Sequence, residues 1–393
     1  MSQSSPATSW GLARQMGIYV AGLSGKLPSI PLSFEELERQ AQEKLSPQAF
    51  GYIAGSAGSE DTTLANRSAF QRWRIVPRFL RNVLQRDLSI ELLGTRHPSP
   101  LLLGPIGVLG IVHEQAELAV AQAASTLQMP FVLSTVSSKS MEEVATRGGK
   151  GTRWFQLYWP GKQELAASFV HRAEKAGYSA IVITLDTYLL AWRERDLQNA
   201  YLPFLQGLGL ANYFTDPVFQ QLVGEDPRHN PRKAIETFGA IFSNPGLTWD
   251  DLHWLRGQTK LPILLKGILH PEDAKLAQSL GMDGIIVSNH GGRQLDGAIA
   301  ALDALPGVVD AVQGKLPVLF DSGIRRGSDV LKAMALGAKA VLVARPYAYG
   351  LAMHGSAGVE DVMCNLLADL DLSLGLMGCK NLSEVTREML VKV

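Results

Sequence analysis

Short apolar runs alternate with amphipathic stretches from about residue 100 onward. The runs are rich in Val, Ile, Leu and Phe at both odd and even positions, which is typical of parallel strands buried on both faces. Between them, apolar residues recur at three- and four-residue spacing, which predicts helices. The runs predicted to be strands are 101–107, 130–135, 153–158, 180–186, 262–268, 283–289, 317–323 and 340–346.

The predicted helices include residues 113–128, 162–177, 271–281 and 327–338. Eight strand–helix units are the number found in a (β/α)8 barrel, so we predict an α/β fold with a TIM barrel over about residues 100–350. A doubly wound sheet is the alternative, because periodicity alone does not reveal whether a sheet closes. The polar residues at the strand ends favour the barrel.

Two segments depart from this rhythm. The first precedes the barrel and looks mostly helical, with Ser33 and Glu36 as a capping box. The second is a long connection after the fourth predicted strand. Long connections inside a domain are usually functional or disordered. Because this one contains many aromatic residues, we predict that it folds as a lid. The predicted organisation is a single domain, 1–393, with an N-terminal helical extension at about 33–92, a lid insertion at about 188–247 and C-terminal helices at about 355–393.

The charge balance, the cysteine count and the length of the apolar runs argue against several classes of protein. The chain has 37 basic and 37 acidic residues, which argues against a nucleic-acid or acidic-membrane surface. Cys364 and Cys379 show no metal-ligand pattern, so we expect neither a metal site nor a disulfide framework. The N-terminus lacks signal-peptide features, and no apolar run approaches the ~20 residues that span a bilayer. We therefore expect a cytoplasmic protein that binds a small molecule.

Polar residues stand at the carboxyl end of nearly every predicted strand, where barrel enzymes place their active sites. After the last two strands, Gly323 allows close approach of an anion, and Arg325 and Arg345 can donate to phosphate oxygens. Salt bridges between surface loops are the alternative role for these arginines. Together the two strand ends predict a phosphate site.

The stretch SNHGGRQLDG at 288–297 follows the sixth predicted strand. His290 is suited to accept a proton near neutral pH, although a buried structural histidine is the more common case. Arg193 and Arg293 together can hold one carboxylate. We expect the two glycines to leave room for bound groups, and Asp321 to stabilise protonated His290, unless it merely orders a loop.

Lys266 ends the fifth predicted strand. Three roles remain open for it: a Schiff-base nucleophile, a fixed cation beside a cofactor, or a partner in a structural salt bridge.

Several motifs, among them SNHGGRQLD, FDSGIRRGSDVLKAMALGA, LPILLKGI, FQLY and ITLDT, resemble the FMN-dependent 2-hydroxy-acid oxidases and dehydrogenases over about residues 32–390. NYFTDPVFQ and LKGILHPEDA are most similar to the lactate 2-monooxygenase branch. The resemblance implies FMN, molecular oxygen, a small L-2-hydroxy acid such as L-lactate, and a homo-oligomer, either a tetramer or an octamer. It implies oxidation of lactate to acetate, carbon dioxide and water. The alternatives are a lactate oxidase that releases pyruvate and hydrogen peroxide, a Schiff-base aldolase, and an FMN-binding barrel without activity.

The resemblance also implies residue roles. His290 is the base, Arg193 and Arg293 bind the substrate carboxylate, and Tyr52 and Tyr158 orient the substrate. Lys266 lies near flavin N1, and Asp321 supports His290. The remaining cofactor contacts are Pro105, Ile106, Gly107, Ser134, Gln156, Thr184, Ser288, Ser322, Gly323, Ile324, Arg325, Ala344 and Arg345. The family usually has glycine where this chain has Ala344, and AWRERDL (191–197) departs from the family pattern beside the substrate.

Overall fold

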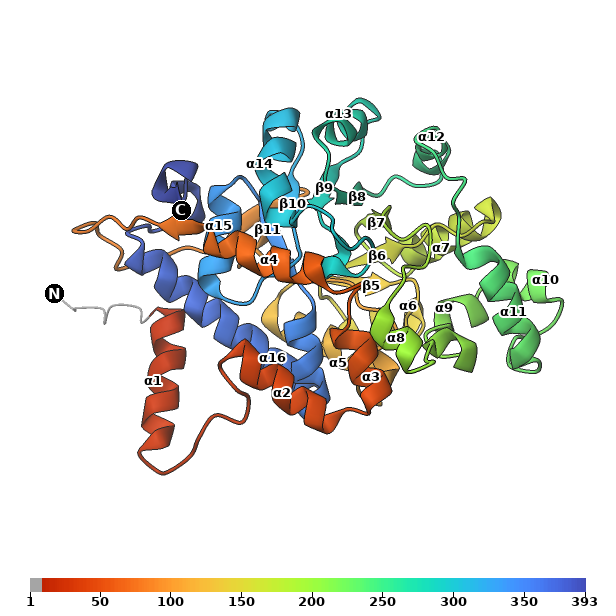
Figure 1. The fold of residues 1–393 in the computed structure, drawn as a ribbon, viewed down its shortest axis with the longest axis horizontal. Coiled ribbons are helices and arrows are strands. Elements are labelled where there is room, and N and C mark those ends of the chain that lie inside the picture. The colour runs from red at the N-terminus through yellow and green to blue at the C-terminus, as the bar shows by residue number, and fades with distance from the viewer. Residues whose placement is uncertain (1–8) are drawn as a thin grey trace.

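The computed structural model describes residues 9–393, and its centre is a closed barrel of eight parallel strands (Figure 1). The strands follow one another around the barrel in chain order, and the last pairs with the first. Each strand lies within one predicted apolar run, which confirms the TIM barrel. The strands are β4 (Leu101–Leu103), β5 (Phe131–Ser134), β6 (Arg153–Leu157), β7 (Ile181–Thr184), β8 (Ile263–Ile268), β9 (Gly284–Val287), β10 (Val318–Phe320) and β11 (Ala340–Val343).

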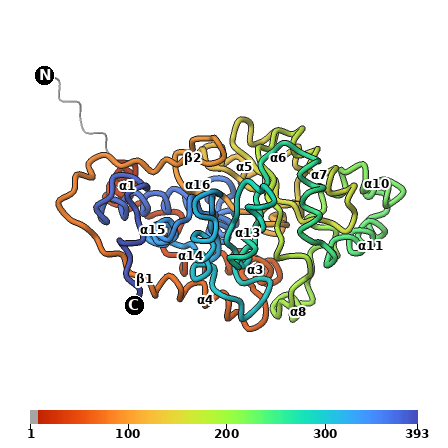
Figure 2. Tube along the Cα trace, turned by 90° about the horizontal axis from the view of Figure 1, so that it is seen from above, coloured from red at the N-terminus to blue at the C-terminus, as the bar shows by residue number. Residues whose placement is uncertain are grey.

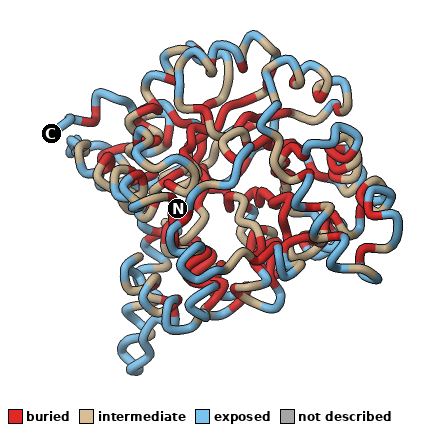
Figure 3. The backbone as a smooth tube through the Cα atoms, turned by 45° about the vertical axis from the view of Figure 1, so that its right-hand side comes forward, coloured by how far each residue is buried: buried red, intermediate tan, exposed pale blue. Residues whose placement is uncertain are grey.

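Both faces of these strands are buried. Val182 and Leu264 point into the barrel and belong to its inner cluster. Their neighbours Ile181 and Leu265 belong to the larger cluster that includes the surrounding helices. Figure 3 shows the buried residues concentrated in the interior and the exposed ones on the outer helices and loops. Burial on both faces explains why the runs are continuously apolar rather than alternating.

Helices follow every strand and cover the outside of the barrel. The four predicted helices are confirmed to within a few residues at each end. The helices are α5 (Ala116–Leu127), α6 (Met141–Gly148), α7 (Gln163–Lys175), α12 (Asp251–Arg256), α13 (Pro271–Ser279), α14 (Ala301–Val312), α15 (Gly327–Ala335) and α16 (Arg345–Leu376). The backbone of α16 is non-helical at His354 and Gly355, where the helix is kinked.

The N-terminal part is helical over a shorter range than predicted. The helices α1 (Trp10–Gly22), α2 (Phe34–Lys44), α3 (Pro47–Ala54) and α4 (Asp61–Gln71) are followed by short strands. Ser33 caps α2 by accepting the Glu36 N–H at 3.2 Å. The expectation of helix up to residue 92 is wrong beyond Gln71. There β1 (Trp73–Ile75) pairs with β12 (Leu390–Lys392), and β2 (Ile90–Leu92) pairs with β3 (Thr95–His97).

The insertion after β7 is folded, as its aromatic content predicts. It contains α8 (Glu194–Gln198), α9 (Ala211–Phe214), α10 (Pro217–Val223) and α11 (Pro231–Phe242). Two of its prolines are the first residues of helices, directly after the capping side chains of Asp216 and Asn230. This is the position in a helix where proline costs nothing.

Part of the insertion is anchored to the barrel helix α7. The Arg172 guanidinium donates to Asp216 at 2.9 Å and to the Asn212 carbonyl at 2.8 Å, and Asp216 is fully buried. The ring of Tyr213 meets that of Phe169 at 5.0 Å between centroids. Figure 2 shows α10 and α11 at one end of the molecule, and α1 and β1 at the other.

Within residues 9–393, the structure contains no helix with the length and apolar character needed to cross a membrane.

Candidate active site

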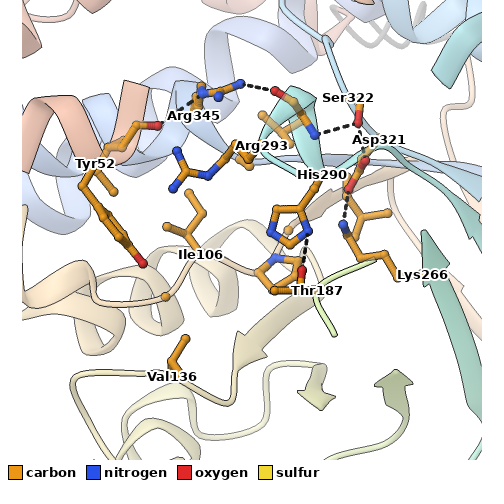
Figure 4. Close-up of a pocket in the computed structure, with 18 of the residues that line it drawn as sticks. Tyr52, Ile106, Val136, Thr187, Lys266, His290, Arg293, Asp321, Ser322 and Arg345 are labelled. Carbon is orange, nitrogen blue, oxygen red and sulfur yellow. Dashed lines mark hydrogen bonds and ion pairs between the residues drawn. The ribbon is translucent and has the colours of Figure 1, made fainter. Parts of the chain in front are cut away.

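A cavity with about 1080 Å³ of empty volume opens at the carboxyl ends of the barrel strands (Figure 4). The predicted site residues that line it are Tyr52, Pro105, Ile106, Gly107, Tyr158, Arg193, Lys266, His290, Arg293, Asp321, Ser322, Gly323, Ile324, Arg325, Ala344 and Arg345. The other predicted residues do not line the cavity but are buried nearby: Ser134, Gln156, Thr184 and Ser288.

His290 lies on an unusual piece of backbone. It has φ 59°, and Gly291 and Gly292 follow with φ 66° and 82°. A non-glycine residue in the left-handed region is uncommon, and such strain concentrates at functional sites. A Cβ on Gly292 would lie 2.8 Å from the Thr63 amide nitrogen, and one on Gly291 would lie 3.1 Å from Arg345 Nη1. The expectation of room for bound groups is therefore wrong for Gly292, which admits the protein's own α4, whereas Gly291 lines the cavity beside Arg345.

Asp186 holds the imidazole of His290. Its Oδ1 lies 2.7 Å from His290 Nδ1, and the Thr187 hydroxyl lies 3.2 Å from the same nitrogen. The other nitrogen, Nε2, lies 3.4 Å from the Tyr158 hydroxyl. This arrangement turns Nε2 toward the cavity, because the carboxylate accepts from Nδ1–H.

The predicted contact between Asp321 and His290 is wrong. Asp321 Oδ2 instead lies 3.1 Å from Lys266 Nζ, which also donates to the Ser288 hydroxyl at 2.9 Å. Asp186 takes the role expected of Asp321. The sequence signal for Asp186 was its place at the end of the fourth apolar run, directly after ITL.

Burial and charge set the protonation states of these groups. Burial lowers the pKa of His290 despite the opposing effect of Asp186, so the imidazole is neutral at neutral pH and can accept a proton. Burial alone would raise the pKa of Asp186, but the charges of His290 and Lys266 hold it at about 2. Burial also opposes the charge on Lys266, yet Asp321 and Asp186 raise its pKa overall. A Schiff-base lysine needs a lowered pKa, so this environment disfavours that role.

Four arginines bring uncompensated positive charge to the cavity. Among residues 9–393, no carboxylate forms an ion pair with Arg193, Arg293, Arg325 or Arg345. Burial, with the charge of neighbouring arginines, lowers the pKa of Arg293 and of Arg325 to about 9. Because a guanidinium keeps its proton, this reflects an unfavourable positive charge that a bound anion would relieve.

The arginines fall into two groups. Arg193 Nε donates to the Arg293 carbonyl at 3.1 Å, and the Arg293 guanidinium stands 5.3 Å from the Tyr52 ring centroid. Arg345 lies close to this pair, since it donates to the carbonyls of Gly55 and Gly291 at 3.1 and 3.0 Å. Arg325 directly follows the segment 321–324, where Gly323 has φ 102°, a value that favours glycine. The first group therefore adjoins His290, and Arg325 adjoins the start of α15.

Buried polar atoms without a hydrogen-bond partner indicate whether the residues at the cavity fit a cofactor. Among the described residues, no hydrogen-bond partner reaches the buried Gln156 Nε2, Thr184 Oγ1 or Arg325 Nε. Buried polar atoms normally have partners, so these three fit a polar ligand that the chain itself does not supply. All three belong to residues predicted to contact FMN.

The comparisons with known proteins agree with this geometry. The model of the family described as FMN-dependent dehydrogenase matches residues 41–392. An L-lactate oxidase from Lysinibacillus sphaericus is 49% identical over 362 residues, covering 92% of this chain and 93% of its own. An FMN-dependent alpha-hydroxy acid dehydrogenase from Penicillium citrinum is 44% identical, covering 96% and 95%.

A solved structure of mandelate oxidase with (S)-4-hydroxymandelic acid is also similar. It superposes with a TM-score of 0.82 at 38% identity, covering 92% of this chain and 99% of the other. The family match extends over most of the chain and includes the barrel, the insertion and the cavity residues. The chain therefore belongs to the FMN-dependent dehydrogenase family and is an FMN-dependent 2-hydroxy-acid oxidoreductase.

Proposed function

We propose that the protein oxidises a small L-2-hydroxy acid, with L-lactate as the first substrate, and passes the electrons to oxygen. The observation that carries this proposal is that His290, held by Asp186 at 2.7 Å, shares one cavity with Arg193 and Arg293, which have no carboxylate partner among residues 9–393. Oxidation of a 2-hydroxy acid requires a base for its hydroxyl proton and a cationic site for its carboxylate.

In the proposed reaction, Arg193 and Arg293 bind the substrate carboxylate as a charge-assisted clamp. Tyr52 and Tyr158 donate hydrogen bonds that orient the substrate. His290 Nε2 takes the hydroxyl proton, and the Asp186 carboxylate stabilises the imidazolium that results. FMN, when bound, would supply the acceptor for the α-hydrogen and its electron pair, and a route for the electrons to oxygen.

Residues on the cofactor side would bind FMN. Lys266 keeps its positive charge and is proposed to stand near flavin N1, where it would stabilise the reduced ring. Asp321 positions Lys266 through the 3.1 Å ion pair. Gly323, Arg325 and Arg345 are proposed to hold the phosphate, with Ser322, Ile324 and Ala344 beside it, and Pro105, Ile106 and Gly107 against the ring. The remaining cofactor contacts are proposed to come from four buried polar residues near the cavity: Ser134, Gln156, Thr184 and Ser288.

We propose release of pyruvate and hydrogen peroxide, because a relative that is 49% identical is named L-lactate oxidase. The monooxygenase outcome, acetate with carbon dioxide and water, requires pyruvate to stay under the insertion until peroxide attacks it. Purified holoenzyme incubated with L-lactate in air separates the two. Equal amounts of pyruvate and peroxide support the oxidase, whereas acetate without peroxide contradicts it. Failure of L-lactate to bleach the flavin without oxygen would contradict lactate as the substrate.

The compartment and the assembly stay predictions from the sequence: the cytoplasm, and a homotetramer or homo-octamer.

Replacing Arg293 by lysine is expected to weaken substrate binding by about 10- to 100-fold, because the fork that grips a carboxylate is lost while the charge remains. The measurement is the Kd of L-lactate or of a non-reacting 2-oxo acid, from titration of the flavin spectrum. Arg232→Lys is a matched control, since the Arg232 side chain is 90% exposed and its ion pair is with Glu236, one turn away on the same helix. An unchanged Kd in the Arg293 variant would rule out the clamp.

A further inference from the structure

The end of the active-site cavity beside Tyr158 is apolar. Four apolar side chains line this end: Val136 after β5, and Leu190, Phe204 and Phe242 from the insertion. The charged residues of the lining belong to the base, the clamp, the Lys266–Asp321 pair and the phosphate site. Figure 4 shows Val136 across the cavity from Arg293 and Arg345.

Ring contacts connect this apolar end with the base. The Tyr158 hydroxyl lies 3.4 Å from His290 Nε2, and the Tyr158 ring meets that of Phe242 edge to face at 5.7 Å between centroids. Phe242 in turn lies 5.7 Å from Phe204. A substrate whose hydroxyl faces His290 can therefore direct its side chain along these rings.

Gly209 packs closely against two residues of this apolar end, Val136 and Phe204. A Cβ on Gly209 would lie 3.4 Å from Phe204 Cε1 and 3.0 Å from the Val136 carbonyl oxygen. Val136 and Phe204 are 3% and 6% exposed, so they form a fixed wall. Leu190 is 49% exposed and forms the rim where the cavity reaches solvent.

We propose that this apolar path is a side-chain subsite, and that the preferred substrates are L-2-hydroxy acids with an extended apolar side chain. The inference rests on the proposed function and names its substrate class. A methyl group covers little of a surface made by two phenyl rings, a valine and a leucine, whereas a chain of several methylenes buries against all four. The subsite offers no cation for a second carboxylate, so dicarboxylic 2-hydroxy acids fit it poorly.

The test measures kcat/KM of the holoenzyme, by anaerobic flavin reduction, for L-lactate, L-2-hydroxyhexanoate, L-2-hydroxyoctanoate and L-malate. The value is expected to rise by about fourfold for each methylene that becomes buried, and L-malate is expected to fall below L-lactate. A value that falls with chain length while L-lactate reduces the flavin would overturn the subsite and leave the proposed function standing. Reduction by none of the acids would overturn both.

Leu190→Asp and Leu189→Asp form a matched pair of variants. The two leucines are adjacent and equally exposed, at 49% and 52%, but only Leu190 lines the cavity. The ratio of kcat/KM for 2-hydroxyoctanoate over lactate is expected to fall about tenfold or more in Leu190→Asp, because a carboxylate at the rim opposes apolar burial. The ratio is expected to stay at the parent value in Leu189→Asp. Equal ratios in the two variants would overturn the assignment of the rim.

Discussion

Replacing His290 by glutamine is expected to leave FMN bound and to slow flavin reduction by L-lactate on the order of 10²–10⁴-fold, the usual contribution of a positioned base. The amide fills similar space but cannot accept the hydroxyl proton. FMN contacts are assigned to other residues, so the flavin absorbance of the variant should match that of the parent.

Stopped-flow reduction without oxygen measures this loss. His229→Gln is the control, because His229 is exposed on the insertion. His290→Asn is a second variant, since asparagine tolerates the left-handed backbone that His290 adopts at φ 59°. Reduction at the parent rate in both His290 variants would show that the proton goes elsewhere.

Replacing Asp186 by asparagine is expected to lower the reduction rate on the order of 10²-fold or more. The carboxylate fixes the tautomer with the proton on Nδ1 and stabilises the imidazolium, and the amide does neither well. Asp310→Asn is a suitable control, because the Asp310 side chain is 64% exposed and pairs with Arg387 at 3.4 Å, far from His290 in the fold.

The pH profile distinguishes this role from a merely structural one. The base must be neutral to accept a proton, so kcat/KM falls as the pH drops through the pKa of His290. Asp186 raises that pKa against the lowering effect of burial. Without the carboxylate the pKa falls further below 6.5, and the acid limb of the profile moves to lower pH. An acid limb that stays in place would argue against the dyad.

The barrel was predictable from the sequence because burial on both faces forces each strand to be continuously apolar. Val182 and its neighbour Ile181 illustrate this, since one fills the barrel and the other packs under the helices. The pairing of β1 with β12 was not predictable, because Trp73 and Lys392 lie at opposite ends of the chain and neither strand carries a marked pattern. The aromatic residues of the insertion predicted that it folds but not where its helices begin, and two of them begin at Pro217 and Pro231.

The site residues were predictable as a set, but their partners were not. Sequence order suggested that neighbouring strands supply His290 and its carboxylate. In a barrel, however, side chains of alternate strands share one layer. His290 after β9 therefore meets Asp186 after β7, and Lys266 on β8 meets Asp321 after β10. Each ion pair skips one strand.

Gln294, which follows the clamp residue Arg293, joins several parts of the site. Its amide oxygen accepts from Arg193 at 2.9 Å, and its nitrogen donates to the carbonyls of Asp186 and Leu189 at 2.7 and 3.1 Å. The Gln294 side chain thus connects Arg193 of the carboxylate clamp with the backbone of Asp186 and with Leu189 at the start of the insertion. A redesign of the cavity entrance for a new acid must therefore keep the backbone carbonyls of Asp186 and Leu189 in place. A shift of the Leu189 backbone would move Gln294, and through it Arg193, and would change kcat as well as KM.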